Sequence, residues 1–404
     1  MNGIRINYYD ISDSAIICVY ELNDIQLSDA NELLQTTYYM IPFTKIVRGL
    51  PATIPFVGPE AIERDAGHMF KLRLGANESA FGVSPLAVQA MREAISRTSW
   101  YGDPEGFDLR AALADHVGVN MDEIVLGAGI DELLGVLVRM LIEPGATVVT
   151  SLGAYPTFNY HVVGHGGQLL TVPYKDDKED LPGLLNAVHA HSVPLVYLAN
   201  PDNPMGTWHD ALTVQQFIDA LPKSTVLVLD EAYVEFAPDG TAPKVDTDDK
   251  RVVRMRTFSK AHGMAGARIG YAIANWEMIE GFSKIRNHFG VNRIAQAGAL
   301  ASLQDGAFAK SVVEEVARGR EEYATLAQDL GLSTVDSATN FVAIDMGGDG
   351  DKSRATLRAL QQQGVFVRMP SVALLDRCIR VTVGQSEERS QFTDVFTEVV
   401  NLNR

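Results

Sequence analysis

Short apolar runs alternate with helical segments through the middle of the chain. Six runs are apolar on both faces and predict buried strands, at residues 123–126, 147–150, 195–199, 226–229, 251–257 and 269–274. Segments with apolar positions at helical spacing separate several of them, at residues 132–142, 181–190 and 214–221. Buried strands interleaved with helices predict an α/β fold with a mostly parallel sheet, covered on both sides.

The pattern changes on either side of this region. Before it, residues 85–97 and 107–117 are helical, and Ser84-Pro85 is a good start for the first of these helices. After it, we expect one long helix over about 276–303, another over 312–330, and strands at 341–345, 365–368 and 379–383. This order predicts a large domain over residues 85–305 and a smaller α+β domain over 306–404.

The first part of the chain follows no clear helical or strand period. Residues 1–50 combine an apolar patch, Ala15 to Tyr20, with acidic and polar stretches. We expect a poorly ordered extension here, and the alternative is an arm that packs on a partner. Residues 51–84 would then form an N-terminal arm that leads into the large domain.

The composition is that of a globular protein, with 404 residues, 46% of them hydrophobic, and a net charge of −17. An acidic surface repels nucleic acid and anionic membranes. No apolar run reaches the ~18 residues that span a bilayer, and the N-terminus lacks the pattern of a signal peptide. Cys18 and Cys378 lie in no C-x-x-C pattern, so we expect no disulfide framework, no metal site and a reducing, cytoplasmic location.

Polar residues gather where the predicted strands end, and this edge of an α/β sheet is where ligands bind. Gly127-Ala128-Gly129 leads from a strand into a helix, and such a turn can hold an anion at the helix N-terminus. The third glycine of a dinucleotide fingerprint is replaced by Glu132, and no P-loop follows. Alone, this turn is a weak indication.

Two further turns carry side chains that could bind a flat ring. Tyr155 follows the strand at 147–150 and could stack on the ring, although a packed aromatic is the more common role. Asn203 lies in the sequence NPDNPMGT at 200–207, where two prolines and a glycine fix the loop. This sequence is more specific than an ordinary stiff turn requires.

The last two strand ends supply an acid and an amine. Asp230 ends an apolar run, and a buried carboxylate needs a protonated ring nitrogen, an arginine or strong donors. Lys260 lies in a glycine-rich stretch between apolar segments, where desolvation would make its amine nucleophilic. A structural salt bridge and a solvated surface lysine are the respective alternatives. Ser259 and Arg268 flank the lysine, and both suit a phosphate.

Together these residues form the set that pyridoxal phosphate (PLP) requires. A lysine joins the cofactor covalently, and an acid keeps the pyridine nitrogen protonated. Side-chain donors hold the ring hydroxyl, and an anion site anchors the phosphate. The combination is more informative than any one of its members.

The motifs that carry this set resemble those of the fold-type I PLP-dependent aminotransferases of class I and II. The resemblance covers about residues 68–400, through NPDNPMGT (200–207), DEAY (230–233), TFSKAHGMAGAR (257–268) and IRVTVG (379–384). Within that family the chain is most similar to the histidinol-phosphate aminotransferases. The resemblance implies a seven-stranded-type sheet in a large PLP-binding domain, a smaller α+β C-terminal domain, and a homodimer.

The resemblance also implies a role for each matching residue. Lys260 would hold PLP and then move a proton, and Asp230 would pair with the pyridinium nitrogen. The other cofactor contacts would be Ile130, Asp131, Ser259 and Arg268 at the phosphate, Asn203 and Tyr233 at the ring oxygen, Tyr155 on the ring face, and Tyr101 at the phosphate held by the partner subunit. Substrate contacts would be Arg380, Arg368 and Asn77.

The sequence leaves the substrate open, because it departs from the family pattern at Ser79-Ala80, Ala128, Ile130 and Gly153-Ala154. We expect transamination of an amino acid or of an amino-alcohol phosphate resembling histidinol phosphate, as in histidine biosynthesis, with 2-oxoglutarate as the acceptor. The alternatives are an aromatic amino acid aminotransferase, a PLP-dependent decarboxylase of a phosphorylated amino acid, and an aminotransferase-like regulatory protein. The last is disfavoured because residues 1–50 lack a basic cluster.

Overall fold

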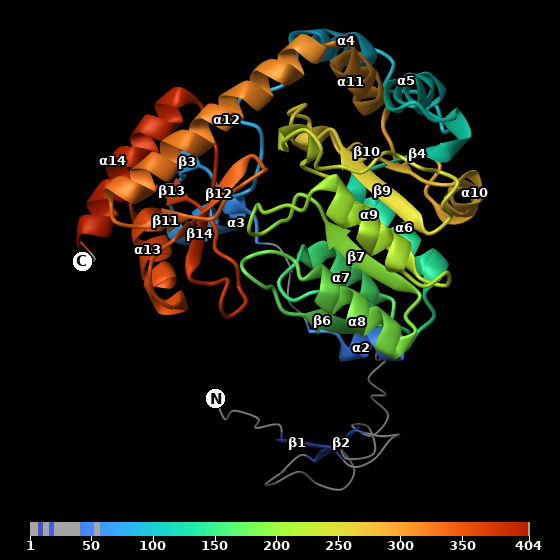
Figure 1. Ribbon diagram of the computed structural model, residues 1–404, viewed down its shortest axis with the longest axis horizontal. Coiled ribbons are helices and arrows are strands. Elements are labelled where there is room, and N and C mark those ends of the chain that lie inside the picture. The colour runs from blue at the N-terminus through green and yellow to red at the C-terminus, as the bar shows by residue number, and fades with distance from the viewer. Residues whose placement is uncertain (1–6, 11–15, 20–40, 52–56, 403–404) are drawn as a thin grey trace, which may run out of the picture. The chain divides into compact units, whose positions relative to one another are not determined.

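The computed structural model describes residues 7–10, 16–19, 41–51 and 57–402 (Figure 1). The chain divides into two units, Met1–Gly49 and Leu50–Arg404. In the first unit, β1 (Asn7–Asp10) pairs antiparallel with β2 (Ile16–Val19), and α2 (Lys45–Gly49) follows. No strand is predicted from the sequence here. Poor order is expected for residues 1–50, and most of those residues lie outside the described part of the chain.

A seven-stranded sheet forms the centre of the second unit, in the order β4-β10-β9-β8-β7-β5-β6. Its strands are β4 (Ile124–Gly127), β5 (Thr147–Ser151), β6 (Gln168–Val172), β7 (Leu195–Ala199), β8 (Val226–Asp230), β9 (Val252–Thr257) and β10 (Gly270–Ile273). Neighbouring strands run parallel except at β10, which is antiparallel to β4 and β9. The predicted mostly parallel sheet is confirmed. The additional strand, β6, lies at the sheet edge, where its half-buried residues lack a continuous apolar run.

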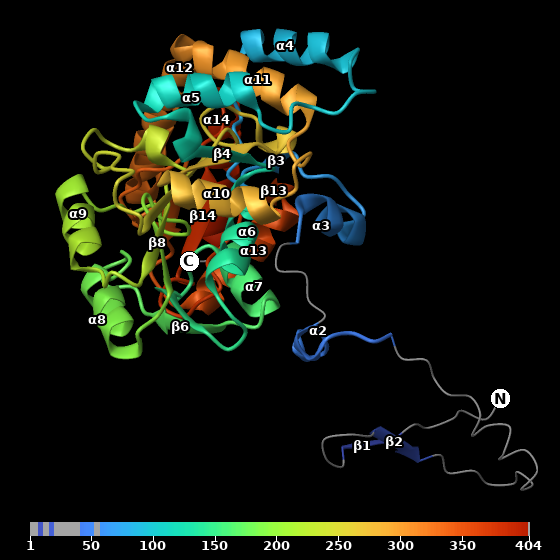
Figure 2. The same ribbon diagram turned by 90° about the vertical axis from the view of Figure 1, so that its right-hand side faces the viewer.

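Helices cover both faces of this sheet (Figures 1 and 2). Alternate residues of β7 show the two faces, because Leu195 and Tyr197 join one hydrophobic cluster and Val196 and Leu198 join another. The first cluster includes residues of α6 (Ile130–Leu141), α7 (Pro156–Gly164) and α10 (Trp276–Ile285), and the second includes residues of α8 (Leu181–His191) and α9 (Ala211–Ala220). No helix in the described part of the chain is long and apolar enough to cross a membrane.

The prediction of one long helix over 276–303 is wrong, because the segment forms two helices. α10 ends at Ile285, and α11 (Arg293–Gln304) begins eight residues later and packs beside α4 (Pro85–Ile95) and α5 (Phe107–Val117). Asn292 caps α11 by accepting a hydrogen bond from the Ala295 amide at 2.8 Å. The connecting residues include Asn287 and Gly290, which favour turns over helix.

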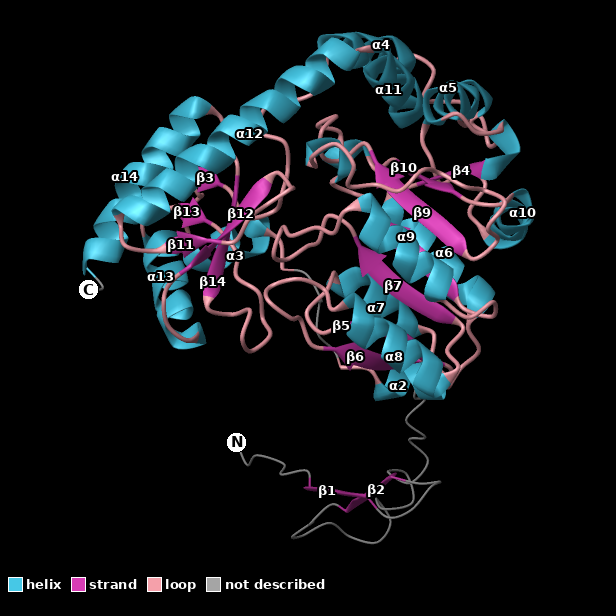
Figure 3. Ribbon diagram, viewed as in Figure 1, coloured by secondary structure: helices cyan, strands magenta, loops and turns pink. Residues whose placement is uncertain are grey.

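A smaller α+β layer follows at the C-terminal end (Figure 3). Its antiparallel sheet has the order β11-β12-β14, with β11 (Ser333–Thr334), β12 (Phe341–Asp345) and β14 (Cys378–Thr382). Its helices are α12 (Gly306–Asp329), α13 (Gly350–Gln362) and α14 (Ser386–Leu402). Residues of the predicted N-terminal arm join this layer, because β3 (Leu72–Arg73), which follows α3 (Pro59–Ala66), pairs parallel with β13 (Val365–Phe366). The domain boundaries at 50, 84 and 305 stay predictions.

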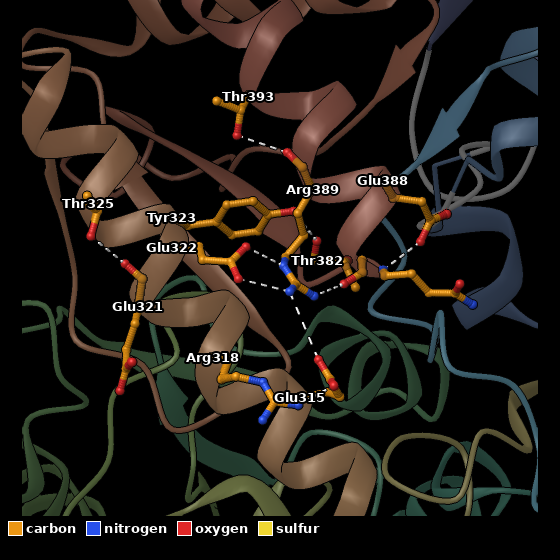
Figure 4. Close-up of polar contacts among 12 residues, drawn as sticks. Glu315, Arg318, Glu321, Glu322, Tyr323, Thr325, Thr382, Glu388, Arg389 and Thr393 are labelled. Carbon is orange, nitrogen blue, oxygen red and sulfur yellow. Dashed lines mark hydrogen bonds and ion pairs between the residues drawn. The ribbon is translucent and has the colours of Figure 1, made fainter.

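A buried arginine ties α12 to α14 (Figure 4). Arg389 on α14 donates to both carboxylate oxygens of Glu322 on α12, at 2.6 and 3.0 Å, and to the Gly384 carbonyl at 2.8 Å. Paired hydrogen bonds of this kind fix a guanidinium firmly. The neighbouring Tyr323 donates to the Thr382 carbonyl at 3.3 Å. The helical layer therefore supports the end of β14.

Candidate active site

A cavity of about 770 Å³ lies at the carboxyl ends of the parallel strands. The turns after five of the strands contribute to its wall: Asp131 after β4, Tyr155 after β5, Asn203 after β7, Tyr233 after β8 and Lys260 after β9. Residues that are far apart in the sequence therefore share one space, as expected for this sheet type. The remaining predicted residues that line the cavity are Asn77, Ile130, Asp230, Ser259, Arg268, Arg368 and Arg380.

The Lys260 amine lies inside this cavity. Its Nζ donates to the Asn77 carbonyl at 3.0 Å and lies 5.4 Å from the centre of the Tyr233 ring. Gly263, at φ +69°, brings the lysine loop against the segment at Gly82, since an added Cβ would stand 1.8 Å from the Gly82 carbonyl oxygen. Only glycine permits that approach, so the loop that carries the lysine is fixed by close backbone packing.

Asp230 is a buried carboxylate that has hydrogen-bond donors but no cation. It is 5% exposed, and it accepts hydrogen bonds from the Tyr197 hydroxyl at 2.7 Å and the Ala232 amide at 2.9 Å. Burial raises the pKa of Asp230 to about 6, although these two bonds act to lower it. Within residues 57–402 no lysine or arginine forms an ion pair with it. A buried acid in this state suits a protonated nitrogen of a ligand.

Tyr197 is a site residue that is not predicted from the sequence. It lies within β7, is fully buried, and stacks on Phe158 with ring centroids 4.6 Å apart. The available signal is a hydroxyl inside an otherwise apolar strand, because a buried tyrosine hydroxyl needs a partner. Glu179 is buried and accepts from the Ala199 amide at 2.9 Å, but it does not line the cavity.

Asn203 and Tyr233 each retain a donor for a ligand. Arg380 donates to the Asn203 side-chain oxygen, which leaves the Asn203 amide nitrogen available. Asn77 Nδ2 donates to the Tyr233 oxygen at 2.9 Å, which leaves Tyr233 its own O–H to donate. Two available donors in one cavity suit a negatively charged ring oxygen.

The N-terminus of α6 and Arg268 form the anion-binding end of the cavity. Gly129, at φ +84°, makes room for the arginine, because a Cβ there would stand 2.4 Å from Arg268 Nη2. Arg268 donates to the Ala265 carbonyl at 3.0 Å and lies 3.5 Å from the Asp131 carboxylate. Asp131 also accepts from the Tyr155 hydroxyl at 2.9 Å. Backbone amides at a helix start beside a guanidinium are a typical phosphate site.

Two arginines lie side by side at another wall of the cavity. Arg368 and Arg380 face each other across an antiparallel bridge, with backbone hydrogen bonds of 3.2 and 2.6 Å. Burial, followed by the neighbouring Arg380 charge, lowers the pKa of Arg368 to about 10. Arg380 is buried, and its Nε has no hydrogen-bond partner among the described residues. Two close guanidiniums of which one is buried suit an anionic group of a substrate.

Two of the predicted residues, Asn77 and Tyr101, differ in how they relate to the cavity. Asn77 is buried. Its backbone carbonyl accepts from Lys260, and its side-chain nitrogen donates to the Tyr233 oxygen. Tyr101 does not line the cavity of its own chain, since it is 76% exposed and packs on Phe289 with ring centroids 4.5 Å apart. Its contact with the phosphate of a partner subunit stays a prediction.

The residues present fit PLP. The cavity offers an amine at Lys260, a buried acid without a cation at Asp230, an aromatic side chain at Tyr155 and an anion site at Arg268. The described residues contain no group of three or more His, Cys, Asp or Glu placed to hold a metal ion.

The chain matches proteins of known type over most of its length. The family model for aminotransferase class I and II matches residues 70–396. The chain is 32% identical over 356 residues to histidinol-phosphate aminotransferase 1 of Bacillus cereus (strain ZK / E33L), covering 87% of this chain and 95% of that protein. It is 34% identical over 366 residues to histidinol-phosphate aminotransferase 2 of Carboxydothermus hydrogenoformans, covering 89% and 99%.

Solved structures give the same result. The histidinol-phosphate aminotransferase of Sinorhizobium meliloti in complex with pyridoxal-5'-phosphate has a TM-score of 0.88 and 49% identity, covering 90% of this chain and 99% of that one. The aspartate aminotransferase of Thermus thermophilus with maleate has a TM-score of 0.75 at 22% identity, covering 89% and 100%. The second similarity shows the fold alone.

Proposed function

The chain belongs to the class I and II aminotransferase family, and from that premise we propose that it transfers the amino group of histidinol phosphate, or of a similar anionic amine, with PLP as cofactor. The observation that carries the proposal is that Lys260 and the buried Asp230, which forms no ion pair in the described part of the chain, line one cavity. The PLP complex of the 49% identical relative supports the choice of cofactor. When bound, PLP supplies an electron-withdrawing ring that stabilises negative charge on the substrate carbon.

The side chains of the cavity divide the remaining work. Lys260 holds the cofactor covalently and, once released, moves the proton at the substrate Cα. Asp230 ionises beside the ring nitrogen, because two opposite charges favour each other's charged forms. Asn203 donates to the ring oxygen through its side-chain nitrogen and Tyr233 through its O–H, since the described residues bond only the oxygen of each side chain. The α6 N-terminus and Arg268 hold the phosphate.

Arg380 and Arg368 support an anionic substrate. A buried guanidinium with an unpartnered Nε is costly unless a ligand completes its hydrogen bonds. The phosphate of histidinol phosphate and the carboxylates of 2-oxoglutarate are both suited to bidentate arginine contacts. We therefore assign 2-oxoglutarate, or a 2-oxo acid like it, as the acceptor. Such a reaction of small metabolites fits the cytoplasm, which we propose as the location.

We also propose a homodimer. Trp100, Tyr101 and Phe289 are all exposed, and the last two pack against each other. Arg293 donates to the Tyr101 carbonyl and so fixes the loop that carries Trp100 and Tyr101. Exposed aromatic residues held in place are typical of an interface, and a second copy of the chain would cover them. Sedimentation equilibrium tests this directly, and a monomer at micromolar concentration would contradict it.

A half-reaction tests the proposed function. PLP-loaded protein is mixed with histidinol phosphate without an acceptor, and the visible absorbance of the loaded form is expected to disappear within one turnover. Phenylalanine, tyrosine, leucine and alanine serve as competing donors. Arg380→Met is expected to weaken the reaction with histidinol phosphate by about 10²-fold, because one charged hydrogen-bonding group is lost. Arg354→Met, in an exposed ion-paired residue of α13, is the matched control.

The outcomes separate the candidate functions. A fast reaction with phenylalanine and none with histidinol phosphate rejects the substrate and favours an aromatic amino acid aminotransferase. Release of carbon dioxide without any 2-oxo acid requirement favours the decarboxylase. A loaded protein that reacts with no amine contradicts the enzyme assignment as a whole.

A further inference from the structure

Asn77 has an unusual backbone conformation beside Lys260. Its φ is +55°, in the left-handed region, and the residue is 2% exposed. This region costs about 1 kcal/mol for a residue other than glycine, although asparagine tolerates it better than most. A buried residue keeps such a conformation only when its surroundings fix it. The contacts of Asn77 therefore reveal what the conformation is for.

Thr382 and Asn340, both from the C-terminal α+β layer, fix Asn77. The Asn77 backbone N–H donates to Thr382 Oγ1 at 3.1 Å, and the threonine hydroxyl donates to Asn77 Oδ1 at 3.3 Å. Asn340 Nδ2 donates to the Asn77 carbonyl at 3.1 Å. Thr382 is itself held, because its carbonyl accepts from Tyr323 and its amide donates to the Leu74 carbonyl at 2.8 Å.

The same asparagine bonds two residues that the proposed function places at the cofactor. Its carbonyl also accepts from Lys260 Nζ at 3.0 Å, and its Nδ2 donates to the Tyr233 oxygen at 2.9 Å. Because the Tyr233 oxygen accepts this hydrogen, its own O–H must donate elsewhere. The ring oxygen of the cofactor is the acceptor that the proposed function supplies.

We propose that Thr382 is a positioning residue that acts through Asn77 on Tyr233 and Lys260. Thr382 holds Asn77 so that the asparagine side-chain nitrogen donates to the Tyr233 oxygen. The Tyr233 O–H is then directed toward the cofactor. The Asn77 carbonyl accepts a hydrogen bond from the Lys260 amine whenever that amine is not bonded to the cofactor. This assignment rests on the proposed function and deepens it, since it gives the C-terminal layer a direct part in the geometry of the reacting groups.

The test replaces the hydroxyl of Thr382 without changing the shape of the side chain. Thr382→Val removes both hydroxyl contacts with Asn77, whereas Thr382→Ser keeps them and should rescue the effect. Thr393→Val removes a threonine hydroxyl that bonds only the Arg389 carbonyl within α14, so it is the matched control (Figure 4). The readout is the pH midpoint of the visible absorbance of the PLP-loaded protein.

A donor to the ring oxygen favours the charged form of that oxygen. Loss of the oriented Tyr233 hydroxyl in Thr382→Val should therefore move the midpoint upward by about half to one pH unit. The rate of the single-turnover reaction should fall about tenfold while the affinity for the donor changes little, because only the reacting groups are displaced. Thr382→Ser and Thr393→Val should both titrate like the unaltered protein.

A midpoint in Thr382→Val equal to that of the unaltered protein overturns the proposal, and so does an equal shift in Thr393→Val. If Thr382→Val does not fold, Asn340→Ala removes the other anchor of Asn77 and should shift the midpoint in the same direction. An unchanged midpoint in Asn340→Ala then overturns the proposal as well. Failure of the proposed function looks different, because the unaltered protein would then either show no visible absorbance band with PLP or keep that band unchanged when histidinol phosphate is added.

Discussion

The two ends of the cavity, at Asp230 and at Arg268, differ in how far their charged groups are buried. Asp230 is 5% exposed and forms no ion pair among the described residues, whereas the Arg268 side chain is 45% exposed and already lies near the Asp131 carboxylate. Charges that are shielded from water interact strongly, while exposed charges are screened by solvent and salt. We infer that the buried end controls the chemistry and the exposed end controls how tightly the cofactor stays bound. The comparison makes separate predictions for variants at each end.

The largest effect is expected at the buried end. Asp230→Asn removes the charge that keeps the ring nitrogen protonated, and kcat should fall about 10³-fold at saturating PLP. Single-turnover kinetics with histidinol phosphate measure the loss. Asp210→Asn, at the exposed cap of α9, is the control because asparagine also caps helices. A fall of less than tenfold would remove Asp230 from the chemistry.

The same variant should stabilise the protein when PLP is absent. The pKa of Asp230 rises from 3.8 to about 6 on folding, so the folded chain binds more protons than the unfolded chain between these values. The free energy of unfolding contributed by this group therefore falls as pH rises through that window. At pH 7, Asp230→Asn should gain about 2–3 kcal/mol in urea unfolding, and the gain should shrink toward pH 4. An equal gain at both pH values would contradict this account.

A smaller effect, of another kind, is expected at the exposed end. Arg268→Met removes one charged donor from the phosphate, and the Kd for PLP should rise about 10- to 100-fold. Because the ring end is untouched, kcat at saturating PLP should change less than about threefold. Fluorescence titration with PLP gives the Kd, and Arg318→Met on the surface of α12 is the control. A large loss of kcat with unchanged Kd would reverse the assignment of the two ends.

The smallest effect is expected from the hydrogen bond that supports the buried acid. Tyr197→Phe removes a bond that lowers the pKa of Asp230, so that pKa should rise above about 6 in the free protein. The acidic limb of PLP binding should then move to higher pH, and kcat should fall about three- to tenfold. The pH dependence of the Kd for PLP measures the shift. Tyr271→Phe, a buried tyrosine on β10, should leave the limb in place.

The sequence was most informative where a polar residue stands at or shortly after the end of a predicted strand. Asp230 and Lys260 could be assigned in this way, because the carboxyl ends of parallel strands meet at one edge of the sheet. The mostly parallel sheet followed from the same alternation of strands and helices. The edge strand β6 and the mostly polar helix α14 gave no comparable signal, since only part of each is buried.

Residues inside strands could not be assigned from the sequence in the same way. Tyr197 reaches Asp230 because β7 and β8 pair with Ala199 opposite Asp230, which makes the tyrosine a diagonal neighbour of the acid. That relation depends on which strands are adjacent and in what register. Thr382 and Asn77 are 305 residues apart in the chain, and only the folded structure brings them together.

Chemical trapping tests the central claim that Lys260 and Asp230 serve one bound cofactor. PLP-loaded protein is reduced with sodium borohydride, digested, and mapped by mass spectrometry in the unaltered form and in Asp230→Asn. Reduction should attach one cofactor per chain to Lys260, and Lys260→Ala should carry none there. A label on another lysine of the unaltered protein, or no label at all, would contradict the account.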